Sequence, residues 1–162
     1  MESLSSIKPF IRFVRFLTIN EGDYSDFLVP YDSRLFFCLD DNGKITFEND
    51  EFQTRAGRVF LWKSGVKYML SAKAEQPARF IAINFDFSSQ FTHNSAPIPP
   101  DYEHNFKPCN LLKTPDFSDG LPFPVVLDDV FFLQKHMENM LKEYEGQRQH
   151  SQLMLSGMMQ EP

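Results

Sequence analysis

A succession of short apolar runs between Phe10 and Asp86 constrains the fold of this chain more than any other feature. Turn residues separate the runs at roughly the 8–12-residue spacing of β sandwiches and barrels, and no helical period continues across them. The clearest turn contains Asn42-Gly43, a pair that favours the positive φ angles of a tight hairpin. The predicted strands cover residues 13–19, 34–39, 44–48, 58–62, 68–72 and 78–86. This part of the sequence therefore predicts a closed or double-sheet β domain.

The pattern changes twice after the last predicted strand. Residues 88–124 hold most of the prolines and predict an irregular connector that wraps the barrel. Apolar residues spaced by three and four then predict a helix with an N-cap at Asp128 or Asp129. Its apolar residues are Val130, Leu133, Met137, Met140, Leu141 and Tyr144, and a second, Met-rich stretch contains Leu153, Leu155, Met158 and Met159. We expect a barrel with its connector over residues 1–124 and a helical segment over residues 125–162.

Charge and cysteine content exclude several functions. The formal net charge is −6 and the isoelectric point is near 5.2, so these residues lack the basic surface that neutralises a phosphate backbone, and we expect no DNA binding by them alone. No apolar run approaches the ~20 residues that cross a bilayer. Cys38 and Cys109 lie far apart and form neither a CxxC motif nor a disulfide framework. We therefore expect a cytoplasmic protein with reduced thiols.

Residues around the fourth and fifth predicted strands resemble the second motif of the cupin superfamily. Gly57 opens a strand, Ser64-Gly65 forms the turn after it, and Tyr68 starts the next strand. In metal-dependent cupins a His stands at the position of Tyr68, and Arg34 stands about where the preceding motif has its Glu. The resemblance therefore implies a barrel without the usual His and carboxylate ligands of a transition metal, and we expect no metal and no other cofactor.

The cupin resemblance also indicates which side chains face the interior. If Arg34 and Tyr68 point inward, strand alternation predicts inward positions for Phe36, Phe80 and Asn84, together with Cys38, Leu70 and Ala82. Aromatic rings beside a few hydrogen-bonding groups suit a sugar. The predicted ligand-binding residues are Arg34, Phe36, Trp62, Tyr68, Phe80 and Asn84. Arg34 has an alternative role in an ion pair with Asp32 or Asp86, and Trp62 has an alternative place under the helical segment.

A wider resemblance covers most of the chain. Residues 31–37, Leu61-Trp62 and residues 80–87, with their Asn-Phe-Asp-Phe sequence, together resemble the N-terminal domain of AraC-type transcription regulators. The resemblance implies a mainly β fold with C-terminal α structure: a cupin-like double-stranded β-helix (jelly-roll) barrel followed by an amphipathic helical dimerisation segment. It also implies a helix-turn-helix domain beginning shortly after Glu161, so the chain is expected to be a fragment that reaches DNA only through a domain it does not contain.

This resemblance implies a non-enzymatic sensor of a small molecule, which the interior residues suggest is a carbohydrate. It also implies a homodimer, and the predicted interface residues are Leu133, Met137, Met140, Leu141 and Tyr144. Residues 1–9 are expected to be either disordered or a lid over the effector. Two alternatives stay open: a cupin-type sugar isomerase, epimerase or dioxygenase, which needs a metal or an acid–base pair inside the barrel, and a purely structural dimerisation domain.

Overall fold

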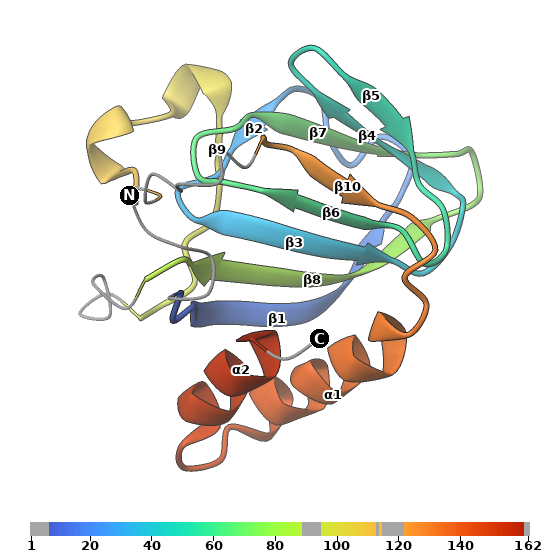
Figure 1. Cartoon of the computed structure of the whole chain (residues 1–162). Helices are drawn as coiled ribbons and strands as arrows, with labels where there is room; N and C mark the ends of the chain where they lie inside the picture. The colour runs from blue at the N-terminus through green and yellow to red at the C-terminus, as the bar shows by residue number, and fades with distance from the viewer. Residues whose placement is uncertain (1–6, 89–94, 113, 115–121, 161–162) are drawn as a thin grey trace.

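The computed structural model describes residues 7–88, 95–112, 114 and 122–160, and its elements are labelled in Figure 1. The strands are β1 (Phe10–Ile19), β2 (Leu28–Val29), β3 (Ser33–Cys38), β4 (Gly43–Phe47), β5 (Glu51–Gln53), β6 (Val59–Trp62), β7 (Tyr68–Ala72), β8 (Ala78–Asp86), β9 (Asp101–Tyr102) and β10 (Val125–Leu127). The helices are α1 (Leu133–Gly146) and α2 (Ser151–Gln160), and two short 3-10 turns, Glu103–Asn105 and Pro108–Asn110, interrupt the connector.

The strands form two five-stranded antiparallel sheets that pack face to face. The first sheet has the order β1-β8-β3-β6-β10, and the second has the order β5-β4-β7-β2-β9. The chain crosses repeatedly between the sheets, so β3 and β4 are consecutive in sequence yet belong to different sheets. All six predicted strands are present, with ends that differ from the prediction by up to three residues.

Strand alternation divides the apolar side chains into two clusters on opposite sides of the first sheet. The inner cluster lies between the sheets and contains Phe36, Phe60 and Trp62 from the first sheet beside Tyr68 and Leu70 from the second. The outer cluster contains the alternate residues of the first sheet, such as Phe37, Val59, Ile81, Ile83 and Phe85. The first sheet is therefore buried on both faces, which explains why β8 reads as an almost continuous apolar run.

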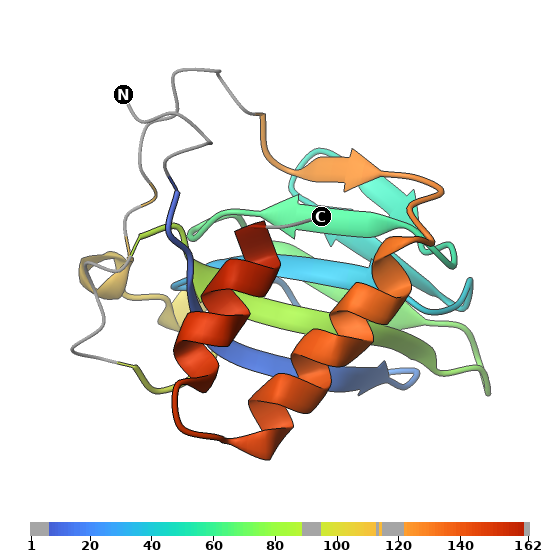
Figure 2. The same ribbon diagram turned by 60° about the horizontal axis from the view of Figure 1, so that its bottom comes forward.

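Helices α1 and α2 cover the outer face of the first sheet (Figure 2). Their Met137, Met140 and Leu155 side chains belong to the outer cluster. The Tyr144 hydroxyl donates a hydrogen bond to the Arg12 carbonyl oxygen, at 3.2 Å. The helices are thus attached to their own barrel by apolar packing and by a polar contact to β1.

The predicted interface of the helical segment requires a correction. Met137 and Met140 are only 4% and 1% exposed because the sheet of the same chain covers them. Leu133, Leu141 and Tyr144 also pack against this outer cluster, with part of each side chain accessible. In this arrangement Met137 and Met140 cannot also form the contact surface of a partner.

The start of the helical segment also differs from the prediction. Residues 125–127 form β10 at the edge of the first sheet, so the barrel extends beyond residue 124. Asp128 binds Arg58 instead of capping a helix, and Asp129 has a φ of 57°, outside the usual range for an N-cap. Helix α1 begins only at Leu133, without a side-chain cap. No helix within the described residues is long and apolar enough to span a membrane.

Candidate functional site

Along the first sheet, the inner face changes from apolar to polar. Phe36 lies opposite Ala82 on β8 and Phe60 on β6, and this row is apolar. Two residues earlier on β3, Arg34 lies opposite Asn84 on one side and Trp62 on the other. Residues directly opposite each other in a sheet share a face, so Asn84, Arg34 and Trp62 form a row of hydrogen-bonding side chains at one end of the barrel.

The structure brings the six predicted ligand-binding residues together, all at least 96% buried. Trp62 packs against Phe36 and Tyr68, with ring centroids 4.8 and 4.9 Å away. Phe36 also contacts Phe80, at 5.5 Å between ring centroids. Trp62 lies in the inner cluster rather than under the helices, because Phe60 and Trp62 are the inward residues of β6. These residues form a packed interior. We call its row of Asn84, Arg34 and Trp62, together with the charged groups described next, the polar end of the barrel.

Two buried ion pairs lie at the polar end. The Arg34 Nε donates to Asp32 Oδ1 at 2.8 Å, and the Arg12 Nε donates to Asp86 Oδ2 at 2.8 Å. The structure therefore contains the ion pair that the sequence offered as an alternative role for Arg34, with Asp32 as the partner. Removal from water raises the pKa of Asp32 from 3.8 to about 6, although the nearby Arg34 charge lowers it in part. Burial likewise raises the pKa of Asp86.

Several buried polar atoms at this end have no hydrogen-bond partner within the described residues. They are Asp32 Oδ2, Trp62 Nε1, Asn84 Oδ1 and Asp86 Oδ1. A buried polar atom without a partner costs about 1–3 kcal/mol. Such a cluster marks a place where water or a ligand supplies the missing partners.

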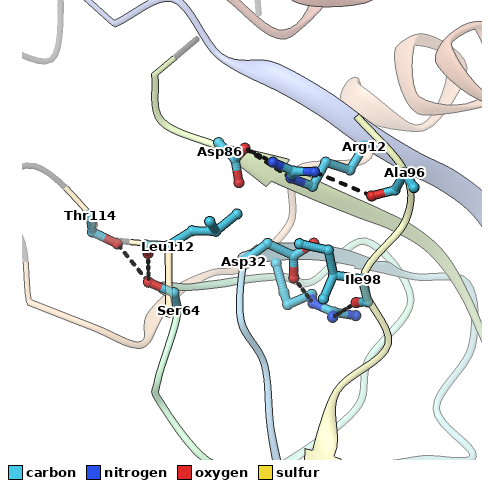
Figure 3. Close-up of polar contacts among 9 residues, drawn as sticks. Arg12, Asp32, Ser64, Asp86, Ala96, Ile98, Leu112 and Thr114 are labelled. Atoms are coloured by element: carbon cyan, nitrogen blue, oxygen red, sulfur yellow. Dashed lines mark hydrogen bonds and ion pairs between the residues drawn. The ribbon is translucent and has the colours of Figure 1, made fainter. Parts of the chain in front are cut away.

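The connector is attached across the polar end (Figure 3). Arg12 Nη1 donates to the Ala96 carbonyl oxygen at 3.2 Å, and Arg34 Nη2 donates to the Ile98 carbonyl oxygen at 3.3 Å. Ser64 Oγ donates to the Leu112 carbonyl oxygen at 2.6 Å. Both arginines therefore contact a carboxylate and a connector carbonyl, so the ion pairs and the position of the connector depend on each other.

Large surface cavities occur elsewhere. One of about 500 Å³ lies outside the first sheet and is lined by Ile7, Pro9, Leu35, Leu61, Phe85, Phe87, Met159 and Gln160. Another of about 460 Å³ is lined by residues that include Phe47, Glu48, Lys67 and Glu103. None of the six predicted ligand-binding residues lines either cavity, which agrees with their burial.

Sequence reasoning missed the full set of charged groups at the polar end. Asp32 and Asp86 entered the prediction only as partners for Arg34, and Arg12 did not enter it. One signal was available: Arg12 falls within a run of mostly apolar residues, where an ionised side chain requires a partner. The connector contacts, by contrast, have no local sequence signal.

The described histidines lie in the connector and in the helical segment. His104 lies in a 3-10 turn, His136 on α1 and His150 before α2, while His93 lies outside the described residues. Within the part of the chain that the structure describes, no group of three or more His, Cys, Asp or Glu side chains is positioned to hold a metal ion.

The raised pKa of Asp32 leads to a pH prediction. Between about pH 4 and pH 6 the folded chain binds this proton more tightly than the unfolded chain, so the free energy of unfolding falls as pH rises through this window. The full shift corresponds to about 3 kcal/mol. Asp32→Asn removes the titration, so the stability of the wild type relative to the variant should fall between pH 4 and pH 7 in urea titrations. A difference that stays constant with pH would contradict the assignment.

Comparisons with known proteins give partial structural likenesses. A cupin superfamily protein from Desulfitobacterium hafniense is 11% identical over 45% of this chain and 65% of its own, with a TM-score of 0.40. A cupin protein from Bacteroides fragilis is 18% identical over 53% of this chain and 76% of its own, with a TM-score of 0.41. The DMSP lyase DddQ from Ruegeria pomeroyi is 12% identical over 56% of this chain and 42% of its own, with a TM-score of 0.44.

The chain thus spans less than two thirds of the first and third of these structures. No protein-family model matches the sequence, and no curated protein matches it significantly. Likenesses at this level carry no argument about function. The fold is described by the chain itself: a mainly β protein with two antiparallel sheets and two C-terminal helices over the first sheet.

Proposed function

We propose that this chain is the effector-sensing and dimerisation part of an AraC-type transcription regulator. In this proposal a small polar molecule, with a carbohydrate as the expected class, binds at the polar end of the barrel without a metal. Binding changes how the barrel packs on α1 and α2, and so changes the geometry of a dimer. DNA is contacted through a further domain that these residues do not include.

The observation that carries this proposal is the cluster of unpartnered polar atoms beside aromatic rings. Asp32 Oδ2 and Asn84 Oδ1 are hydrogen-bond acceptors without a donor, whereas Trp62 Nε1 is a donor without an acceptor. A sugar hydroxyl both donates and accepts, so hydroxyl groups match this mixed set. The two arginines and two aspartates at this end balance in formal charge, which favours a neutral ligand over an ion.

The strand order supports the cupin-like part of the proposal. Without its last strand, each sheet has four strands, β1-β8-β3-β6 and β5-β4-β7-β2. This order is the one expected for a double-sheet jelly roll, the architecture to which cupins belong.

The single Trp of the chain gives a direct test of the site. We expect one or more of D-glucose, D-galactose, D-xylose, L-arabinose and L-rhamnose to raise the melting temperature and to change the fluorescence of Trp62. Asn84→Ala should weaken binding of that sugar about 2- to 10-fold, the value of one hydrogen bond. Cys38→Ala is the control: Cys38 is fully buried in the same interior, but lies at the apolar end, so affinity should be unchanged.

Two outcomes would contradict the proposed site. If none of the five sugars changes the melting temperature or the Trp62 fluorescence, the carbohydrate class is wrong. If a sugar binds and Asn84→Ala leaves its affinity unchanged while Cys38→Ala weakens it, the ligand does not contact the polar end.

A cupin-type sugar isomerase or epimerase is the second candidate, favoured by one specific observation. Asp32 and Asp86 are both buried, 0% and 5% exposed, and supply the carboxylates that an acid–base mechanism needs. Such an enzyme moves a proton at a sugar carbon, so deuterium from D2O would enter the sugar C–H position during turnover. Proton NMR of the same five sugars separates the candidates, since a sensor leaves the C–H signals intact.

A further inference from the structure

Arg58, just before β6, contacts both the end of β5 and the residue that follows β10. Its Nη1 donates to the Gln53 carbonyl oxygen of β5 at 2.8 Å, which ties the start of β6 to the second sheet. Its Nε and Nη2 both donate to the Asp128 carboxylate, with 3.0 Å between Nη2 and Oδ2. Asp128 directly follows β10 on the path to α1 (Figure 1). Paired donation of this kind fixes orientation as well as distance.

The segment between β10 and α1, which we call the linker, is fixed by a second contact beside Gly57. The Val130 N–H donates to the Gly57 carbonyl oxygen at 2.9 Å. Gly57 has a φ of 81°, and a Cβ placed on it would lie 2.8 Å from the Phe131 ring. Glycine is therefore required here both for its backbone conformation and for the close approach of Phe131. We call Gln53, Gly57, Arg58, Asp128 and Val130 the Arg58 joint.

Strand β6 connects this joint to the polar end. Arg58 immediately precedes β6 and Trp62 ends it, with Phe60 between them in the inner cluster. Strand β10 pairs with the edge of β6 that faces away from β3, and Val126 of β10 lies opposite Phe60. The chain then continues from β10 through the linker into α1. A displacement of β6 by a molecule against Trp62 would therefore reach the linker of α1 through a short, fully paired strand.

We propose that the Arg58 joint couples the state of the polar end to the docking of α1, with Arg58 and Asp128 as positioning residues. This inference rests on the proposed sensing function and names the route by which that site is regulated. Coupling is reciprocal: if occupancy at Trp62 alters the docking of α1, loosening α1 at the joint must alter the surroundings of Trp62. The reciprocal effect is measurable without any ligand.

Asp128→Ala breaks the joint at its exposed side. The Asp128 side chain is 47% exposed, so the substitution removes the ion pair without opening a core cavity. Glu51→Ala is the matched control, because Glu51 is 54% exposed and pairs with Lys44, which is not part of the Arg58 joint. We expect Asp128→Ala to speed amide hydrogen exchange about tenfold in both α1 and β6, and to at least double the acrylamide quenching of Trp62. Glu51→Ala should change neither.

Asp128→Glu supplies a conservative rescue, since it retains a carboxylate for Arg58, and it should restore the slow exchange in part. Faster exchange in α1 alone, with β6 and Trp62 as in the wild type, would mean that Arg58 is a local anchor and would overturn the proposal. Unchanged exchange in α1 would overturn it as well. Because no ligand is used, these results are independent of the sugar titration, which tests the proposed function separately.

Discussion

Replacing Arg34 with alanine is expected to lower the free energy of unfolding by about 3–5 kcal/mol at neutral pH, the cost of breaking a buried ion pair on one side. The substitution leaves Asp32, which is fully buried, without its Nε donor. It also removes the donor to the Ile98 carbonyl oxygen, so the connector loses one of its attachments. Urea denaturation of the wild type and the variant measures the loss directly.

The pH dependence of this loss identifies its cause. Without Arg34, the pKa of Asp32 rises further, and acidic solution neutralises the uncompensated carboxylate. The destabilisation should therefore be smaller near pH 5 than at pH 7. The double variant Arg34→Met, Asp32→Leu should regain most of the stability, since apolar replacement of a buried pair is often neutral or better. A single-variant loss under 1 kcal/mol, or a double variant less stable than the single, would contradict the ion-pair account.

The β architecture follows from local sequence patterns. The phase set by Arg34 and Tyr68 places Phe36, Phe80 and Asn84 inside as predicted, because the two-residue period is local. The tight hairpin predicted at Asn42-Gly43 was wrong: neither residue has a positive φ, and β3 and β4 belong to different sheets instead of pairing with each other. Trp62 lies between the sheets rather than under the helices because β6 directs Phe60 and Trp62 inward and Val59 and Leu61 outward.

Features that depend on contacts between distant residues were not predictable from the sequence alone. β2, β9 and β10 have only two or three residues each, too few to show a period. Asp128 matches an N-cap locally, but Arg58, seventy positions earlier, binds its carboxylate instead. Of the two ion pairs at the polar end, Arg34–Asp32 joins residues that are close in the sequence. The Arg12–Asp86 pair joins residues that only the folded sheet brings together.

Met140→Ala is expected to cost about 2–5 kcal/mol, the range for truncating a large buried side chain to alanine. Met140 belongs to α1, is 1% exposed, and contributes to the outer cluster with Met137 and Leu155. Leu153→Ala is the control on α2, because Leu153 is 75% exposed and surface substitutions usually change stability by less than about 0.5 kcal/mol. Both substitutions introduce alanine into a helix, so helix propensity does not separate them.

The exposed apolar side chains of α2 test how a homodimer would form. Since Met137 and Met140 face their own sheet, a dimer requires other apolar side chains, and α2 exposes Leu153 and Met154. Sedimentation equilibrium should show a dimer for the wild type and weaker association for Leu153→Glu, Met154→Glu, with unfolding of the monomer nearly unchanged. A wild type that stays monomeric excludes the dimer. Equal losses of stability for Met140→Ala and Leu153→Ala would instead show that α1 and α2 do not dock on the sheet as described.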